Sequence, residues 1–115
     1  FSRKCGAKYF FYPHPELAEV WGPCIHLIEK RRGLKPGEYD RHAIENCLKE
    51  IAKDTSVDFC PVIDYFIANK SRGPFHLLPR DPHCNPDGYE LLAEVISQFL
   101  IESGFITLND NFKIR

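Results

Sequence analysis

The chain has 115 residues, of which 43% are hydrophobic and 27% charged, and its net charge is −1. This composition is that of an ordinary globular domain and excludes a disordered or collagen-like chain. The balance of 15 basic and 16 acidic residues argues against a nucleic-acid partner, which would require clustered cations. No apolar run approaches the ~18 residues needed to cross a bilayer, so we expect no membrane span.

Five cysteines without paired spacing favour free thiols in a reducing compartment, and we therefore expect a cytoplasmic protein. The chain contains no methionine, and Phe1 is an unusual residue to follow a removed initiator. We interpret residues 1–115 as a single domain that forms part of a longer protein.

The amino-terminal part of the chain predicts a strand followed by an interrupted helix. Residues 7–12 are short, aromatic and closed by a proline, which is typical of a strand buried on both faces. Apolar residues at helical spacing over 17–28 predict one helix face, and we expect Trp21 to belong to the core. Gly22-Pro23 should kink or split this helix, and Gly33 should end it.

The middle of the chain predicts a second helix and a second strand. Asp40 is a candidate N-cap for the helix, because its side chain can accept a backbone hydrogen bond. The apolar stripe of this helix comprises Ile44, Cys47, Leu48 and Ile51. Residues 57–63 predict a strand, residues 64–69 a helical turn, and residues 71–74 a turn.

The carboxy-terminal part contains the strongest helix signal, over residues 86–103. Asn85 can cap it, Pro86 suits its first position, and Gly104 should end it. Its apolar face comprises Leu91, Leu92, Val95, Ile96, Phe99 and Leu100. Residues 105–115 suggest a small hairpin. The order strand, helix, helix, strand, helix predicts an α/β layer architecture with a parallel sheet, incomplete because there are few strands.

The loop before this helix carries a candidate catalytic pair, Asp81 and His83. A carboxylate beside an imidazole can fix its tautomer and stabilise the imidazolium that forms when it accepts a proton. Pro82 favours an extended backbone at Asp81, in which residues two apart point the same way. The spacing therefore permits contact without requiring it.

Asp81-x-His83-x-Asn85-x-x-Gly88-Tyr89-x-x-x-Ala93, followed by an apolar helix, resembles the C-terminal block of the SGNH (GDSL-type) hydrolases. The order of the preceding segments from about residue 7 agrees with that family. The resemblance implies a flavodoxin-like three-layer α/β/α fold, of which this chain is the C-terminal portion. It also implies that His83 is the general base that activates a serine and that Asp81 orients it, with Asn85 and Gly88 in structural roles.

Two departures from the family pattern affect the function. The commoner family spacing is Asp-x-x-His, and the shorter spacing found here resembles branches that include acetyl-transferring members, so hydrolysis and transfer both stay open. The Gly-Asp-Ser block of the family and its Gly-x-Asn-Asp block are absent from these 115 residues. A His–Asp pair without a nucleophile and oxyanion donors has nothing to activate, so we expect this chain alone to be inert.

Other candidates are weaker. His14 follows the first predicted strand, where α/β folds place ligand-contacting loops, so a substrate-binding role is a hypothesis. Asp81, His83 and Cys84 offer three metal ligands, but in cramped geometry and without a fourth, so we expect no metal ion and no cofactor. Cys84 lacks a separate histidine in register, which disfavours a cysteine nucleophile, and His76 is most simply part of a buried segment.

Together these observations favour the C-terminal part of an SGNH-type esterase or acyl hydrolase, acting on a small ester or acyl substrate. The partner would be the missing N-terminal half of the fold or a self-associated copy. The alternative is a non-catalytic, truncated α/β module for binding or oligomerisation. A Gly-Asp-Ser block encoded before Phe1 would favour the enzyme, and a start codon there would favour the module.

Overall fold

The computed structural model of the chain describes residues 4–77 and 81–107. In chain order its elements are β1 (Phe10–Phe11), α1 (Leu17–Val20), α2 (Gly22–Arg32), α3 (Ala43–Thr55), β2 (Asp58–Phe59), α4 (Ile63–Ala68), the 3₁₀ turn η1 (Lys70–Arg72) and α5 (Pro86–Glu102). The two strands pair in parallel, with Phe10 opposite Asp58 and Phe11 opposite Phe59. The predicted mixed α/β class with parallel strands is confirmed, although the described residues are mostly helical. None of the described helices has the length and apolarity to cross a membrane.

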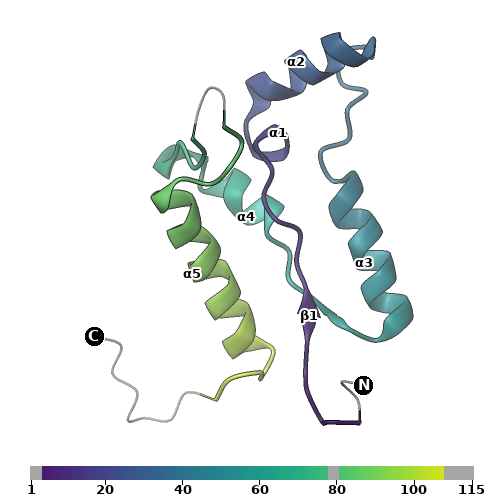
Figure 1. The fold of residues 1–115 in the computed structure, drawn as a ribbon, viewed down its shortest axis with the longest axis vertical. Helices are drawn as coiled ribbons and strands as arrows, with labels where there is room; N and C mark the ends of the chain where they lie inside the picture. Colours follow the sequence, from purple (N-terminus) through teal and green to yellow (C-terminus); the bar gives the residue numbers. More distant parts are fainter. Residues whose placement is uncertain (1–3, 78–80, 108–115) are drawn as a thin grey trace.

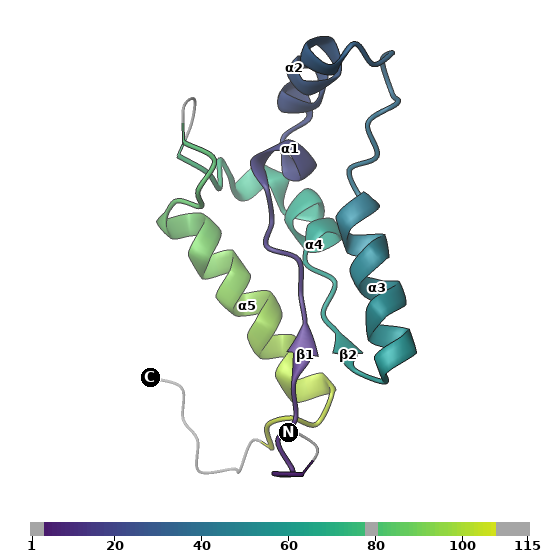
Figure 2. The same ribbon diagram turned by 45° about the vertical axis from the view of Figure 1, so that its right-hand side comes forward.

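Helices α5 and α3 lie on either side of the strand pair (Figures 1 and 2). The ring of Phe99 on α5 packs against Phe10 of β1 at 5.2 Å between centroids, and Phe105 lies 5.7 Å from Phe10. On the other side, the ammonium of Lys49 on α3 stands over the ring of Phe59 in β2 at 5.6 Å. Aromatic rings therefore attach both helices to a sheet that is only two residues long.

The core lies where β2, α4, α5 and the segment before α5 meet. Its buried members are Cys60, Val62, Phe66, Phe75, Leu91, Leu92 and Val95. The rings of Phe66 and Phe75 meet edge to face at 5.3 Å, a geometry that aromatic quadrupoles favour. This core is joined directly to the loop that carries Asp81 and His83, because Phe75 belongs to the same segment.

The predictions for α5 are confirmed. The carboxamide oxygen of Asn85 accepts the backbone N–H of Gly88 at 2.9 Å, as an N-cap should. Gly104 follows the helix with φ of 69°, a left-handed conformation that glycine adopts without steric cost. Leu92 and Val95 are buried, and Phe99 is half-buried against β1.

The predicted interruption at Gly22-Pro23 is confirmed, because α1 and α2 are separate helices. Gly33 ends α2 with φ of 67°, as expected. The prediction that Trp21 is a core residue is wrong, since its side chain is 40% exposed. Trp21 joins the two helices with an extended backbone, which turns it away from the face that its spacing alone would assign.

Helix α3, the helix predicted to begin after Asp40, departs from the prediction at its start and in its buried face. It begins at Ala43 after His42, and the Asp40 carboxylate accepts the backbone N–H of His42 at 2.9 Å instead of capping the helix. Ile44 and Ile51 of the expected stripe are 55% and 43% exposed. The buried positions of α3 are Glu45 and Ala52, because α3 meets its neighbours through a carboxylate contact with Ile63.

Three other predictions have mixed outcomes. The first strand is shorter than expected, Phe10–Phe11 against 7–12, and both residues are half-buried. The hairpin predicted over 105–115 falls largely outside the described residues. The helical turn predicted over 64–69 is confirmed as α4.

Candidate functional site

The site is built on a narrow hairpin that leads into α5. His76 and Cys84 form an antiparallel bridge, and the backbone N–H of Leu77 donates to the carbonyl of His83 at 2.9 Å. The backbone N–H of Asn85 donates to the carbonyl of Phe75 at 2.9 Å. These bonds pair the two arms on either side of the turn and fix the backbone of His83 next to Asp81.

The amino-terminal turn of α5 locks this hairpin in place. The Asn85 carboxamide caps the helix through its oxygen and donates through its nitrogen to the carbonyl of Pro74 at 2.7 Å. Gly88 is buried so close to the opposite arm that an added Cβ would stand 2.2 Å from the carbonyl oxygen of Phe75. No side chain fits there. Asn85 therefore caps the helix, as its position predicted, and Gly88 permits the close packing, a structural role that only the family resemblance had implied.

Asp81 and His83 are in direct contact. The imidazole Nδ1 of His83 donates to Oδ1 of Asp81 at 2.5 Å, and the same oxygen accepts the backbone N–H of His83 at 2.9 Å. This second bond holds the Asp81 carboxylate beside Nδ1 of the imidazole, and the carboxylate in turn orients the ring. With the proton on Nδ1, the other ring nitrogen, Nε2, is left with a lone pair, and no described residue bonds to it.

The carboxylate of this pair is stabilised in its ionised form. The backbone N–H of His83, followed by the imidazole, holds the pKa of Asp81 below its usual range. The two side chains are 50% and 72% exposed for Asp81 and His83 respectively, so water screens their attraction. The pair is ordered by local hydrogen bonds and open to solvent on its outer side.

The hairpin meets the segment that follows β1. The Nε2 of His76 donates to the carbonyl of Pro15 at 2.9 Å, and His76 is buried as predicted. The Sγ of Cys84 lies 3.9 Å from Nε2 of His14. Both contacts place the loop at the carboxyl end of β1, the edge where open α/β sheets bind ligands. His14 is therefore close to the residue next to His83, and its substrate-binding role stays a prediction.

Cys84 is not arranged as a nucleophile. Burial, assisted by the negative charge of Glu16, raises the pKa of the Cys84 thiol. A thiol that keeps its proton is a poor nucleophile, since the thiolate is the reactive form. Its proximity to His14 does not lower that pKa. The expectation that Cys84 has no separate histidine beside it is wrong, because His14 lies next to its thiol, but the raised pKa still disfavours a cysteine nucleophile.

The serines within the described residues do not complete the pair. Ser56 and Ser103 border a hollow with Lys8 and Tyr9, where both strands begin. Lys8 and Tyr9 precede β1, whereas the hairpin of Asp81 and His83 contacts Pro15, which follows β1, so the hollow and the pair are at opposite ends of this strand. No described serine is hydrogen-bonded to His83.

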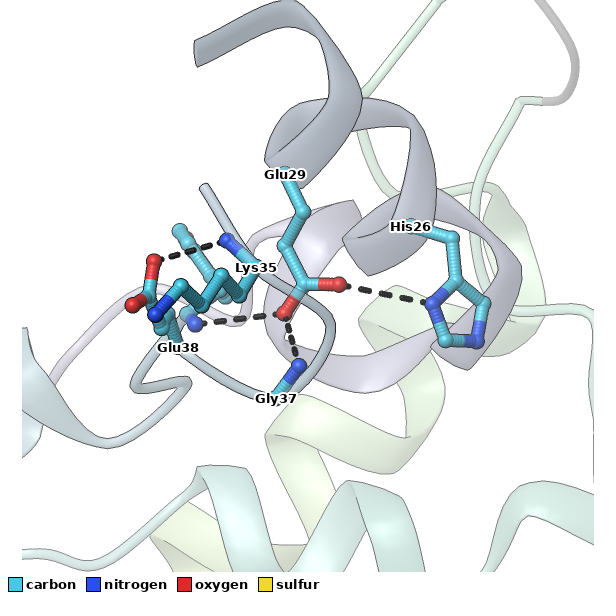
Figure 3. Close-up of polar contacts among 6 residues, drawn as sticks. His26, Glu29, Lys35, Gly37 and Glu38 are labelled. Carbon is cyan, nitrogen blue, oxygen red and sulfur yellow. Dashed lines mark hydrogen bonds and ion pairs between the residues drawn. The ribbon is translucent and has the colours of Figure 1, made fainter. Parts of the chain in front are cut away.

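Buried glutamates are the feature that the sequence did not reveal. The Glu29 carboxylate accepts the backbone N–H groups of Gly37 and Tyr39 at 2.7 and 3.2 Å and faces the His26 ring at 3.4 Å (Figure 3). Burial raises the pKa of Glu29, but the two N–H groups and the ring lower it by more, so it lies below its usual range. Glu29 ties the loop after α2 back onto that helix, a structural role that no local pattern signals.

Glu45 and Glu19 are also buried. The Glu45 Oε2 accepts the backbone N–H of Ile63 at 3.2 Å, while Oε1 lies 2.9 Å from the Lys49 ammonium without hydrogen-bond alignment. Glu19 accepts the backbone N–H of Glu16 at 3.0 Å. Desolvation by burial raises the Glu19 pKa against the effect of that hydrogen bond. Glu45 thus joins α3 to the first residue of α4, whereas Glu19 closes the first turn of its own helix.

Within residues 4–77 and 81–107, no group of three or more His, Cys, Asp or Glu side chains is arranged to hold a metal ion. In particular, Asp81, His83 and Cys84 are not brought together as ligands. Cys84 is buried toward His14, whereas the other two face outward.

Comparison with known proteins gives no family for this chain. No protein-family model, no curated protein and no solved structure matches it.

Proposed function

We propose that this chain is the C-terminal portion of an SGNH-type hydrolase of flavodoxin-like architecture. In this proposal it supplies the base and its orienting carboxylate to a Ser–His–Asp triad that cleaves a small ester or acyl substrate. The proposal is supported by the block Asp81-x-His83-x-Asn85-x-x-Gly88 and by the geometry of its members.

The observation that carries the proposal is the contact of 2.5 Å between His83 Nδ1 and Asp81 Oδ1. It holds the imidazole in the tautomer whose Nε2 can accept a proton, which is the state that a general base needs. The contact lies at the carboxyl end of β1, beside the segment of His14. An Asp-x-His sequence without a catalytic role would need neither this contact nor this position at the carboxyl end of β1.

The mechanism follows from this orientation. Nε2 of His83 takes the proton of a serine hydroxyl as its oxygen bonds to the acyl carbon of the substrate. The imidazolium keeps its Nδ1–H on Asp81, which stabilises the new charge. Nε2 then gives the proton to the leaving alcohol when the ester bond breaks. Water or a second alcohol releases the acyl group from the serine by the same two proton transfers.

The nucleophile must come from outside the described residues in this proposal. The N-terminal half of the fold is the partner that would supply this nucleophile, whereas a second copy of the chain would bring no Gly-Asp-Ser block; either partner would cover the exposed outer side of the pair. Exclusion of water there would strengthen the Asp81–His83 contact, because electrostatic interactions grow as the local dielectric falls.

The test uses a fluorophosphonate, which labels activated serines. The 115-residue chain should not be labelled, and it should hydrolyse p-nitrophenyl acetate no faster than its exposed imidazoles do. The protein encoded by the whole gene should be labelled, and His83→Ala should reduce its esterase activity by several orders of magnitude. The matched control is His26→Ala, which removes an exposed imidazole from α2. Full activity in the His83→Ala protein would contradict the proposal.

A second candidate function, a non-catalytic association module, is favoured by one observation. Ile44 and Ile51 are exposed on the same helix, α3, about two turns apart. We expect Ile44→Lys with Ile51→Lys to abolish any self-association seen by light scattering, because charged side chains oppose burial of that face. Unchanged association in this variant would contradict the module hypothesis.

A further inference from the structure

A small pocket lies between α1 and the segment that precedes the hairpin. Leu17, Val20 and Trp21 form one wall, and residues 73–76 form the other, with Lys70 at the rim. Its volume is about 60 Å³. A single water needs about 10–15 Å³ on this scale, and about 150 Å³ accommodates benzene. The pocket therefore fits an apolar tail of a few carbon atoms.

Lys70 supplies a positive charge to the lining of this pocket. The side chain of Lys70 is exposed and makes no ion pair with any residue of 4–77 or 81–107. Its neighbour Arg72 is already engaged, since its two terminal nitrogens donate to Glu94 at 2.9 and 2.8 Å. The imidazole of His76, which lines the pocket, is held by the Pro15 carbonyl. Lys70 is thus available to an anion at the mouth of an apolar pocket.

The pocket is separate from the Asp81–His83 pair. Successive residues of an extended arm point to opposite faces. His76 and Cys84 are buried on one face of the hairpin, whereas Leu77 and His83 are exposed on the other. A ligand in the pocket would lie behind the hairpin. An inference about it stands or falls independently of the proposed hydrolase function.

We propose that this pocket binds a short-chain carboxylate, with two to three apolar carbons in the pocket and the carboxylate at Lys70. The apolar walls select the tail, because removing each methylene from water is favourable. The ammonium selects the anionic head over a neutral one. The narrow volume limits the chain length.

Trp21 provides a direct readout, because it is the chain's single tryptophan and lines the pocket. Its fluorescence is titrated with acetate, propionate, butyrate, hexanoate and propionamide at constant ionic strength, with sodium chloride as the salt control. We expect saturable changes with millimolar dissociation constants, as suits ligands of so few atoms. Affinity should rise by up to about fourfold per methylene to butyrate and then stop rising. Propionate should bind about two- to fivefold more tightly than propionamide.

Variants separate the two parts of the proposal. Lys70→Met should remove the preference for propionate over propionamide, while Lys53→Met, on the exposed side of α3, should keep it. Val20→Phe should abolish binding by filling the pocket, with folding checked by circular dichroism. Val20→Ala should move the optimal chain length up by one or two carbons, because it enlarges the same wall.

Linear changes that match sodium chloride would overturn the proposal. So would an affinity that ignores chain length, or one that Val20→Phe and Val20→Ala leave unchanged. Equal binding of propionate and propionamide would refute the assignment of Lys70.

Discussion

Replacing Gly88 with alanine tests whether the first turn of α5 truly packs against the hairpin. The added methyl would stand 2.2 Å from the Phe75 carbonyl oxygen and 3.1 Å from Cβ of Cys84, so the helix must move away by at least about 1.2 Å to reach an ordinary contact. Overpacking of this kind costs about 1–3 kcal/mol. The same carbonyl accepts the Asn85 N–H, and weakening that bond adds about 1 kcal/mol. Alanine's higher helix propensity returns up to about 1 kcal/mol.

We therefore expect Gly88→Ala to lower the free energy of unfolding by about 1–3 kcal/mol in urea melts, with an unchanged slope. The matched control is Gly22→Ala in the first turn of α2, where the added Cβ meets nothing within 4 Å. That variant should be neutral or up to about 1 kcal/mol more stable. If the two variants agree within about 0.5 kcal/mol, the close approach of Gly88 to Phe75 is refuted, and with it the geometry assigned to the hairpin.

Three other outcomes follow from contacts described above. Asn85→Ala should lower stability by about 0.5–2 kcal/mol in the same melts, because it removes the α5 cap, and an Asn85→Ser variant that retains a cap should recover most of the loss. Hydrogen bonds lower the folded-state pKa of Asp81, so the stability that its carboxylate contributes to the fold should be fully present above the unfolded-state pKa. That stability should disappear as the pH falls through the folded-state pKa. Titration of the carboxyl ¹³C signal checks this, and an Asp81 pKa at or above its ordinary value would contradict it. Burial, followed by the nearby Glu45 charge, raises the pKa of Cys60 to about 11. The exposed thiol of Cys47 should therefore react with a maleimide at pH 8 before the buried thiol of Cys60 does. Equal reaction rates would place Cys60 at the surface.

The features that sequence alone predicts well are those decided by neighbouring residues. Asn85 caps α5 and Gly33 ends α2 because capping depends on positions within a few residues. The contact between Asp81 and His83 belongs to the same class. Pro82 and the spacing permitted it, and the backbone N–H of His83 adds the bond that holds it.

The features that sequence misses are decided by distant partners. The buried face of α3 is rotated by one residue from the predicted stripe: Ile44 and Ile51 are exposed, the next residues Glu45 and Ala52 are buried, and Glu45 meets the backbone of Ile63. Trp21 follows the helical spacing, yet the break before Gly22 reorients it. Glu29 has the type and position of a surface residue, and its burial depends on two N–H groups from a loop that begins after the helix. Periodicity carries no information about such contacts.

The parallel register of β1 and β2 has a kinetic consequence. Phe10 pairs with Asp58, which lies 48 positions later in the chain, so the whole intervening segment forms the loop that this pairing closes. Closing a loop of that length costs about 3 kcal/mol of chain entropy, and only then can the two short strands form the hydrogen bonds that offset this cost. The hairpin at His76 and the cap of α5, by contrast, join residues close in sequence and are the contacts that a folding chain reaches soonest. We therefore expect strand pairing to be the slow step of folding. Pulse-labelled hydrogen exchange should show the amides of α5 protected before the amide of Cys60, which follows β2 and donates to the carbonyl of Phe11.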